Sequence, residues 1–173
     1  FYTGAWASNV NYGDVGGPDL ELDLYAGWNG DLGEFVNFDA MLVAYTYMGA
    51  DDSYGNSNYA ELITKFAFGD YVTLTAAYTN NYGNADIDVT YLNLGNSWEL
   101  GTSGISLDAA IGRSFGYPVI GDYTDWTVGL SRDFAGVNLG LHYYGTDISV
   151  NILGQNYDIT ASDTIVFSAK YDF

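Results

Sequence analysis

Apolar and polar residues alternate at every second position through most of the chain. The clearest example is residues 20–28, where apolar residues at the even positions alternate with Glu21, Asp23, Tyr25 and Gly27. Successive side chains of a β-strand point to opposite faces, so this period predicts strands with one apolar and one polar face. Clusters of Gly, Asn and Asp separate ten such segments: residues 2–10, 20–28, 35–48, 59–68, 72–79, 86–94, 105–111, 124–131, 137–143 and 163–173.

One of these segments, residues 86–94, has two competing phases. Ile87, Val89 and Tyr91 favour one register, whereas Leu92 and Leu94 favour the other. A β-bulge would accommodate both sets. The pattern therefore predicts a strand here without assigning its faces.

The connections between the segments alternate in length. Residues 30–33, 69–70, 101–104 and 133–136 form short turns, and longer loops lie between them. Transmembrane β-barrels have this arrangement, because their turns are short on one side of the membrane and long on the other. A β-sandwich also has short, regularly spaced strands, but nothing in its architecture sorts turns by length. We therefore expect one all-β domain, residues 1–173, forming an antiparallel up-and-down transmembrane β-barrel of ten strands.

The composition favours the same architecture. Only 15% of the 173 residues are charged, against about 25% in typical soluble proteins, and 17% are aromatic. No stretch approaches the roughly 20 apolar residues of a membrane-spanning helix. A membrane barrel accounts for the low charge and for the lack of a long apolar stretch, since half of the side chains of each strand face lipid and half face a polar lumen. The absence of cysteine fits export through an oxidising periplasm.

The final segment, residues 163–173, ends on its apolar face with Phe173. It resembles the carboxyl-terminal assembly signal of bacterial outer-membrane proteins, a terminal Phe preceded by apolar or aromatic residues at alternate positions. We expect this segment to engage the barrel-assembly machinery. In a barrel of these ten strands alone it should pair with residues 1–10, and if a strand pair is missing from the beginning, that pair belongs between the two segments. The expected location is the outer membrane of a Gram-negative bacterium, with the lipid bilayer and lipopolysaccharide as surroundings.

The polar faces define a candidate lumen rich in carboxylates. With a net charge of −18 and four basic residues, such a lumen would favour cations over anions. We expect a porin that gives small cationic or neutral solutes passive, cation-preferring passage. The alternative is a structural or surface-binding barrel, plugged by its own side chains, whose outer loops, above all residues 145–162, bind a partner. The candidate lumen residues are Glu21, Asp23, Tyr25, Asn37, Asp39, Glu61, Lys65, Asp108, Asp125, His142 and Lys170.

Other functional classes receive less support. The acidic charge argues against nucleic-acid binding, which needs a cationic surface. Hydrolysis by a nucleophile needs a hydroxyl or thiol, a base and an orienting group. His142 is the only histidine, with Asp108 or Asp125 as nearby carboxylates, and in a tyrosine-rich wall it is more often a hydrogen-bonded structural residue. The prediction is therefore that the protein is not an enzyme.

Acidic pairs in the loops raise the question of a metal site. Their carboxylates are suitable calcium ligands, but none has the ordered spacing of a calcium-binding loop. We therefore predict solvated loops, with no metal and no other cofactor. The pairs are Asp51 with Asp52, Asp14 with Asp19, and Asp122 with Asp125.

Aromatic residues gather toward the predicted strand ends, as in the two interfacial girdles of a membrane barrel. On the short-turn side the candidate girdle residues are Trp28, Phe68, Tyr71, Trp98, Tyr171 and Phe173. On the long-loop side the candidates are Tyr45, Tyr47, Tyr59, Tyr78, Tyr143 and Tyr144.

Three segments carry a family resemblance: residues 1–10 (FYTGAWASNV), 20–27 (LELDLYAG) and 123–129 (YTDWTVG). They resemble the TorF family, small proteobacterial outer-membrane proteins described as porins, and the similarity runs over nearly the whole chain. The resemblance implies an outer-membrane location and a pore role, and the family offers no catalytic residues to carry over. Its members begin with a further strand pair ahead of the segment that matches Phe1. The resemblance therefore implies twelve strands for the intact protein, of which the present residues account for ten.

Overall fold

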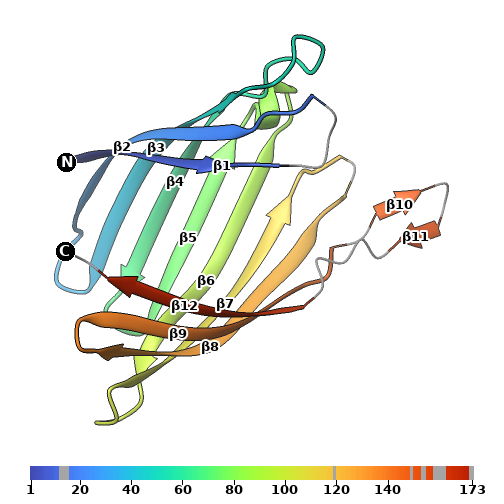
Figure 1. Ribbon diagram of the computed structural model, residues 1–173. Coiled ribbons are helices and arrows are strands. Elements are labelled where there is room, and N and C mark those ends of the chain that lie inside the picture. Colours follow the sequence, from blue (N-terminus) through green and yellow to red (C-terminus); the bar gives the residue numbers. More distant parts are fainter. Residues whose placement is uncertain (12–15, 119, 149, 153–154, 158–162, 172–173) are drawn as a thin grey trace. The chain divides into compact units, whose positions relative to one another are not determined.

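A computed structural model of the protein describes residues 1–11, 16–118, 120–148, 150–152, 155–157 and 163–171. Ten strands form one antiparallel sheet in the order β1-β2-β3-β4-β5-β6-β7-β8-β9-β12 (Figure 1). One short 3-10 helix, η1 (Tyr82–Asn84), precedes β6. The strands of the sheet are β1 (Tyr2–Asn9), β2 (Leu20–Asp31), β3 (Val36–Met48), β4 (Tyr59–Phe68), β5 (Val72–Thr79), β6 (Val89–Glu99), β7 (Ile105–Phe115), β8 (Tyr123–Phe134), β9 (Val137–Thr146) and β12 (Thr164–Tyr171).

The ten-stranded sheet confirms the predicted number of strands and their up-and-down order. Two further strands, β10 (Val150–Ile152) and β11 (Gln155–Tyr157), pair with each other in a separate hairpin (Figure 1). This hairpin lies within the long connection between β9 and β12, which was predicted from the sequence to be an outer loop. Residues 158–162 of that connection lie outside the described residues.

The two ends of the sheet bear on the predicted closure. Among the described strands, β1 pairs with β2 and β12 pairs with β9. Strands β1 and β12 are therefore the two edge strands of the sheet. The expected pairing of residues 163–173 with residues 1–10 is not part of this sheet. Residue alternation defines strands and their faces but carries no information about whether two edge strands meet. The structure therefore establishes a ten-stranded antiparallel meander.

The chain forms two compact units, which are described separately below. Unit 1 comprises Phe1–Phe66 and Thr75–Thr90, and unit 2 comprises Ala67–Leu74 and Tyr91–Phe173. Unit 1 therefore holds β1 to β3, most of β4 and β5, and η1. Unit 2 holds most of β6 and all of β7, β8, β9 and β12.

The turn between β8 and β9 shows how the short connections are made. Its two central residues both have left-handed backbone torsions, with φ of 52° at Ala135 and 83° at Gly136. This combination is the type I′ turn, whose twist matches that of the two strands it joins. Gly136 adopts the conformation freely, whereas Ala135 does so against the usual steric preference of an L-residue.

The predicted ambiguity in residues 86–94 is resolved by the fold. The strand begins at Val89 rather than Asp86, and it continues without interruption to Glu99. Leu92 and Leu94 are exposed, and Tyr91 points to the opposite face, where its hydroxyl reaches Asp125. Val89 lies on the same face as Tyr91 and is buried there. Its burial explains why this apolar residue is out of phase with Leu92 and Leu94.

The burial of the two sheet faces is the reverse of that in a soluble protein. On the polar face of unit 1, Val43, Ala77, Thr79 and Val89 have at most 7% of their surface exposed. On the apolar face of the same unit, Leu42 is 57% exposed. Unit 2 repeats the pattern, with exposed leucine, isoleucine, valine and phenylalanine along β7, β8, β9 and β12. Buried residues thus lie on the polar face and exposed apolar residues on the other face, although β12 is exposed on both faces.

Among the described residues, no helix has the length and apolar character needed to cross a membrane.

Candidate functional site

The polar face of unit 1 is assembled by the pairing of β1, β2 and β3. Residues opposite each other in antiparallel strands share a face, so the register shows which side chains lie together. Asp23 is paired with Tyr45, Glu21 with Tyr47, and Asn29 with Asp39. The register places five predicted lumen residues on this one face: Glu21, Asp23, Tyr25, Asn37 and Asp39.

Near the short turn, this face is held by hydrogen bonds and by aromatic rings packed over glycine. The Tyr2 hydroxyl donates to Asp39 at 2.8 Å, and the Tyr2 ring meets Tyr25 edge-on at 6.5 Å. Each ring covers a glycine of the neighbouring strand, Tyr2 over Gly27 and Tyr25 over Gly4. A side chain at Gly27 would collide with the Tyr2 ring and with a backbone oxygen of β3. Glycine therefore permits the rings to lie against the sheet.

At the long-loop end, the same face carries a cluster of tyrosines and carboxylates. The Tyr45 hydroxyl donates to Glu61 at 3.1 Å, and the Tyr47 hydroxyl donates to Glu21 at 2.9 Å. Tyr59 stacks on Tyr45, with 4.7 Å between ring centroids and 25° between planes. These contacts place Glu61, a predicted lumen residue, beside Glu21 and Asp23. Lys65 lies four residues after Glu61 on β4, and it is exposed.

This cluster corrects the predicted long-loop girdle. Tyr45, Tyr47 and Tyr59 were expected at the membrane interface, but all three belong to the polar face. Tyr144 does too, because it is paired with Thr127 and Thr164. Tyrosine suits either environment, since its ring is apolar and its hydroxyl needs a partner. Tyr78 and Tyr143 remain on the apolar face, where Tyr143 is paired with Val128 and Ile165.

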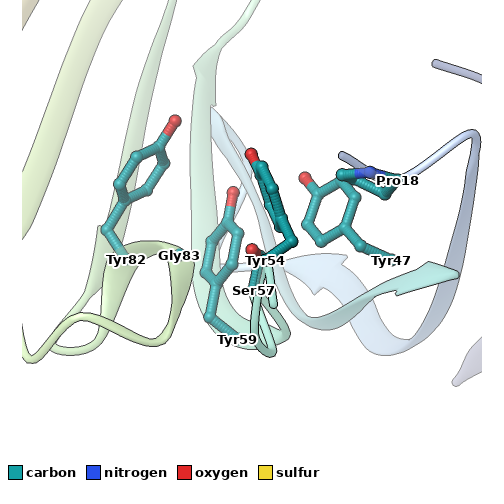
Figure 2. A pocket seen from close by; sticks show the side chains of 7 residues that line it. All are labelled: Pro18, Tyr47, Tyr54, Ser57, Tyr59, Tyr82 and Gly83. Carbon is teal, nitrogen blue, oxygen red and sulfur yellow. The ribbon is translucent and has the colours of Figure 1, made fainter. Parts of the chain in front are cut away.

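A pocket of about 200 Å³ opens beside this cluster (Figure 2). Its walls come from the segment before β2, from β3, from the β3–β4 loop, from the start of β4 and from η1. The residues that line it are Pro18, Tyr47, Tyr54, Ser57, Tyr59, Tyr82 and Gly83. The pocket was not predicted from the sequence, because its residues come from five separate segments.

The polar face of unit 2 centres on His142. The register aligns Asp108, Gly129, His142 and Val166 across β7, β8, β9 and β12. His142 Nε2 and Asp108 Oδ2 are 2.8 Å apart, and both side chains are mostly buried. Gly129 leaves room for the imidazole, since a side chain there would meet the ring. The predicted neighbourhood of His142 and Asp108 is therefore confirmed.

A second polar contact on this face involves Asp125. Its carboxylate accepts a hydrogen bond from the Tyr91 hydroxyl at 3.0 Å, and Asn93 donates to the same hydroxyl at 3.0 Å. The Tyr91 ring lies over Gly112, which is paired with Asp125. Tyr91 and Asn93 were absent from the predicted lumen residues because the phase of their strand was unsettled. Lys170, a predicted lumen residue, is on the same face and is paired with Asn138.

The geometry around His142 does not assemble a nucleophile. A catalytic serine or threonine must lie within hydrogen-bond reach of the base. Within the described residues no serine or threonine hydroxyl is hydrogen-bonded to His142; Ser97 and Ser131 interact with Asp108 instead. The contact is that of a polar wall, in which histidine and carboxylate satisfy each other.

The acidic loop pairs show no common metal-binding arrangement. In the part of the chain that the structure describes, no three His, Asp or Glu side chains converge as metal ligands do. Asp122 accepts a hydrogen bond from the backbone of Gly116 at 3.1 Å, and Asp51 is exposed. Asp14 lies outside the described residues.

The short-turn girdle candidates lie near strand ends. Trp28 is on the apolar face of β2, 6.1 Å from the Phe38 ring. In unit 2, the Trp98 indole donates to the backbone oxygen of Tyr71 at 2.7 Å, which ties the end of β6 to the β4–β5 turn. Phe68 ends β4, and Tyr171 is exposed at the end of β12. Phe173 lies outside the described residues.

The fold and the two faces together define an all-β protein whose sheet has an exposed apolar face and an acidic polar face that is partly buried. The chain belongs to a family described as bacterial protein of unknown function (Gcw_chp), which matches residues 1–173. No curated protein and no solved structure matches the chain.

Proposed function

We propose that the protein is an outer-membrane β-barrel that gives small solutes passive, cation-preferring passage through an acidic lumen. The observation that carries the proposal is the reversed burial of the sheet. Exposed leucines line one face of β2, β3, β8 and β9, while carboxylates and tyrosines share the covered face. Lipid accounts for this reversal, because a bilayer favours apolar side chains on the outside of a barrel.

Strand length and the resemblance to TorF-family porins support the same proposal. The strands of the sheet have 8 to 13 residues, and about 9–11 residues are needed to cross a bilayer at a tilt. Closure requires β12 to meet β1, or a further strand pair to lie between them. A closed barrel would satisfy the backbone groups of both edge strands, which hydrocarbon cannot do.

The lumen proposal rests on the carboxylates of the polar faces. Glu21, Asp23, Asp39 and Glu61 lie on the polar face of unit 1, and Asp108 and Asp125 on that of unit 2. Rings of carboxylates favour cations in membrane pores. A cation preference therefore follows if water fills the space beside these faces.

The direct test is reconstitution in a planar bilayer under a potassium chloride gradient. We expect discrete conductance steps and a reversal potential displaced toward that of potassium. Replacing two lumen carboxylates, Glu21→Gln with Asp23→Asn, should move the reversal potential toward zero. Glu34→Gln is the matched control, because it removes one exposed carboxylate from the short β2–β3 turn. Folded protein without conductance steps would rule out the channel.

Gel electrophoresis tests whether the barrel forms, independently of whether it conducts. A closed barrel resists detergent, so unheated protein should migrate differently from heated protein on a detergent gel. If it does so yet gives no conductance, the alternative of a structural or surface-binding barrel takes its place. The separate β10–β11 hairpin favours that alternative as a specific contact surface. Identical migration of both samples would contradict the barrel.

A further inference from the structure

The tyrosine pocket of unit 1 has the size and walls of a site for a small ligand. Four of the seven residues that line it are tyrosines: Tyr47, Tyr54, Tyr59 and Tyr82. Its volume of about 200 Å³ is below the about 300–1,000 Å³ typical of sites for drug-sized ligands. A ligand that fits is therefore small and mostly surrounded by aromatic rings.

The rings are arranged around Tyr59. The centroid of Tyr82 is 5.1 Å from that of Tyr59 and tilted by 55°, while Tyr47 lies 6.5 Å away and nearly parallel, at 17°. Figure 2 shows the four hydroxyl groups on the same side of the rings. The face of an aromatic ring carries negative potential, and a cation within about 6 Å of its centroid is attracted. Four tyrosine rings that line one small space make an aromatic cage.

Carboxylates behind the rings strengthen the attraction for positive charge. Glu21 accepts a hydrogen bond from Tyr47, and Glu61 accepts one from Tyr45, the ring stacked on Tyr59. Such hydrogen bonds polarise the phenol and make its ring more electron-rich. Within the described residues, the buried Oδ1 of Asp23 has no hydrogen-bond partner.

Positive charge is scarce in this unit. Unit 1 contains twelve acidic residues and one basic residue, Lys65. Lys65 is six residues beyond Tyr59 on the same strand, about 20 Å away at the usual rise per residue. It is therefore too distant to occupy the pocket. An anionic ligand is excluded on the same ground.

We propose that this pocket binds a small organic cation of the quaternary ammonium or alkylated amine class. Its apolar substituents contact the rings of Tyr47, Tyr59 and Tyr82 where these line the pocket, and Glu21 and Glu61 supply the surrounding negative charge. A hydrated metal ion is a poor match, because the pocket walls are rings rather than converging oxygens. The site is independent of the proposed channel, since it needs the fold of unit 1 and no conducting path.

The test is calorimetric titration of the folded, detergent-solubilised protein with choline. The comparison ligand is 3,3-dimethylbutan-1-ol, which has the shape of choline without its charge. We expect choline to bind at least about 10-fold more tightly, since one desolvated cation–π contact contributes up to about 2 kcal/mol. Equal affinity for the two, or affinity for neither, overturns the proposal.

Variants at Tyr82 test the role of the ring. Tyr82→Phe keeps the aromatic face and should bind choline within about twofold of the unchanged protein, whereas Tyr82→Leu should weaken binding about 10-fold. Tyr71→Leu is the control, because Tyr71 is an exposed tyrosine of the short β4–β5 turn. Far-ultraviolet circular dichroism verifies that each variant is folded. Unchanged affinity in folded Tyr82→Leu would contradict the aromatic cage, and Glu21→Gln, expected to weaken choline and not the alcohol, tests the charge independently.

Discussion

The central prediction concerns a single leucine on the exposed apolar face, Leu141. It is the fifth of the ten residues of β9, is 55% exposed, and is paired with Leu130 and Phe167 in a row of apolar side chains. In water, replacing an exposed leucine by arginine changes stability by at most about 0.5 kcal/mol. In lipid the same change places a charge in hydrocarbon. Leu141→Arg therefore distinguishes a lipid-facing sheet from a soluble one.

The magnitude follows from the position of Leu141 along its strand. Val137, on the same face, is four residues closer to the short turn, which is about 13 Å along the strand. With a tilt of about 45°, this corresponds to about 9 Å of depth, and the apolar band of a barrel is about 25 Å tall. Leu141 then lies near the midplane and Val137 near the interface. The expected cost is about 2–4 kcal/mol for Leu141→Arg and about 0–1 kcal/mol for Val137→Arg.

The measurement is reversible urea unfolding from lipid vesicles, followed by tryptophan fluorescence. The expected cost for Leu141→Arg corresponds to a change of about 30- to 900-fold in the folding equilibrium constant. Val137→Arg is the matched control, because it introduces the same charge on the same strand and face. If both variants unfold within about 0.5 kcal/mol of the unchanged protein, the apolar face does not meet lipid, and the proposed outer-membrane barrel loses its main support.

Three further experiments test the polar face and a turn. Gly129→Ala should destabilise unit 2 by about 1–3 kcal/mol in the same unfolding assay, because the added carbon would meet the His142 ring and a backbone oxygen of β9. Asp108→Ala with His142→Ala, measured as a double-mutant cycle, should give a coupling energy of about 0.5–3 kcal/mol, and a value near zero would deny the contact. Ala135→Asn should stabilise the β8–β9 turn by up to about 1 kcal/mol, because asparagine tolerates the left-handed torsion better than alanine, and any loss of stability would contradict the type I′ assignment.

The strands and their faces follow from the sequence because a period of two is a local property. Where one apolar residue lay out of phase, the sequence became ambiguous. Val89 is the example: it is 4% exposed on the polar face of unit 1, whereas Leu92 is exposed on the opposite face of β6. Both residues are apolar, so alternation gives no means of ranking them. Contacts across strands decide the matter, and these depend on register.

The positions of the tyrosines are the second feature that was not predicted correctly from the sequence. Tyr45 and Tyr47 are in phase with Asp39 along β3, so their polar-face position was present in the pattern. The assignment to the interface failed because it relied on distance from the strand end rather than on phase. Their pairing with Glu61 and Glu21 was beyond prediction, since it joins positions 16 and 26 residues apart. The pocket formed around them depends on loops and η1 as well, which no periodic pattern describes.

The way in which the carboxylates are satisfied bears on whether the polar faces can favour cations. A plugged barrel would hold its carboxylates with lysine or arginine, and such ion pairs cancel the charge. Here the partners are mainly phenols: Tyr2 donates to Asp39, Tyr45 to Glu61, Tyr47 to Glu21 and Tyr91 to Asp125. A phenol satisfies a carboxylate oxygen and leaves its negative charge in place. Glycines of the neighbouring strands let the Tyr2 and Tyr91 rings lie flat enough for their hydroxyls to reach. The tyrosine-rich, lysine-poor composition is thus what keeps these faces both ordered and negatively charged.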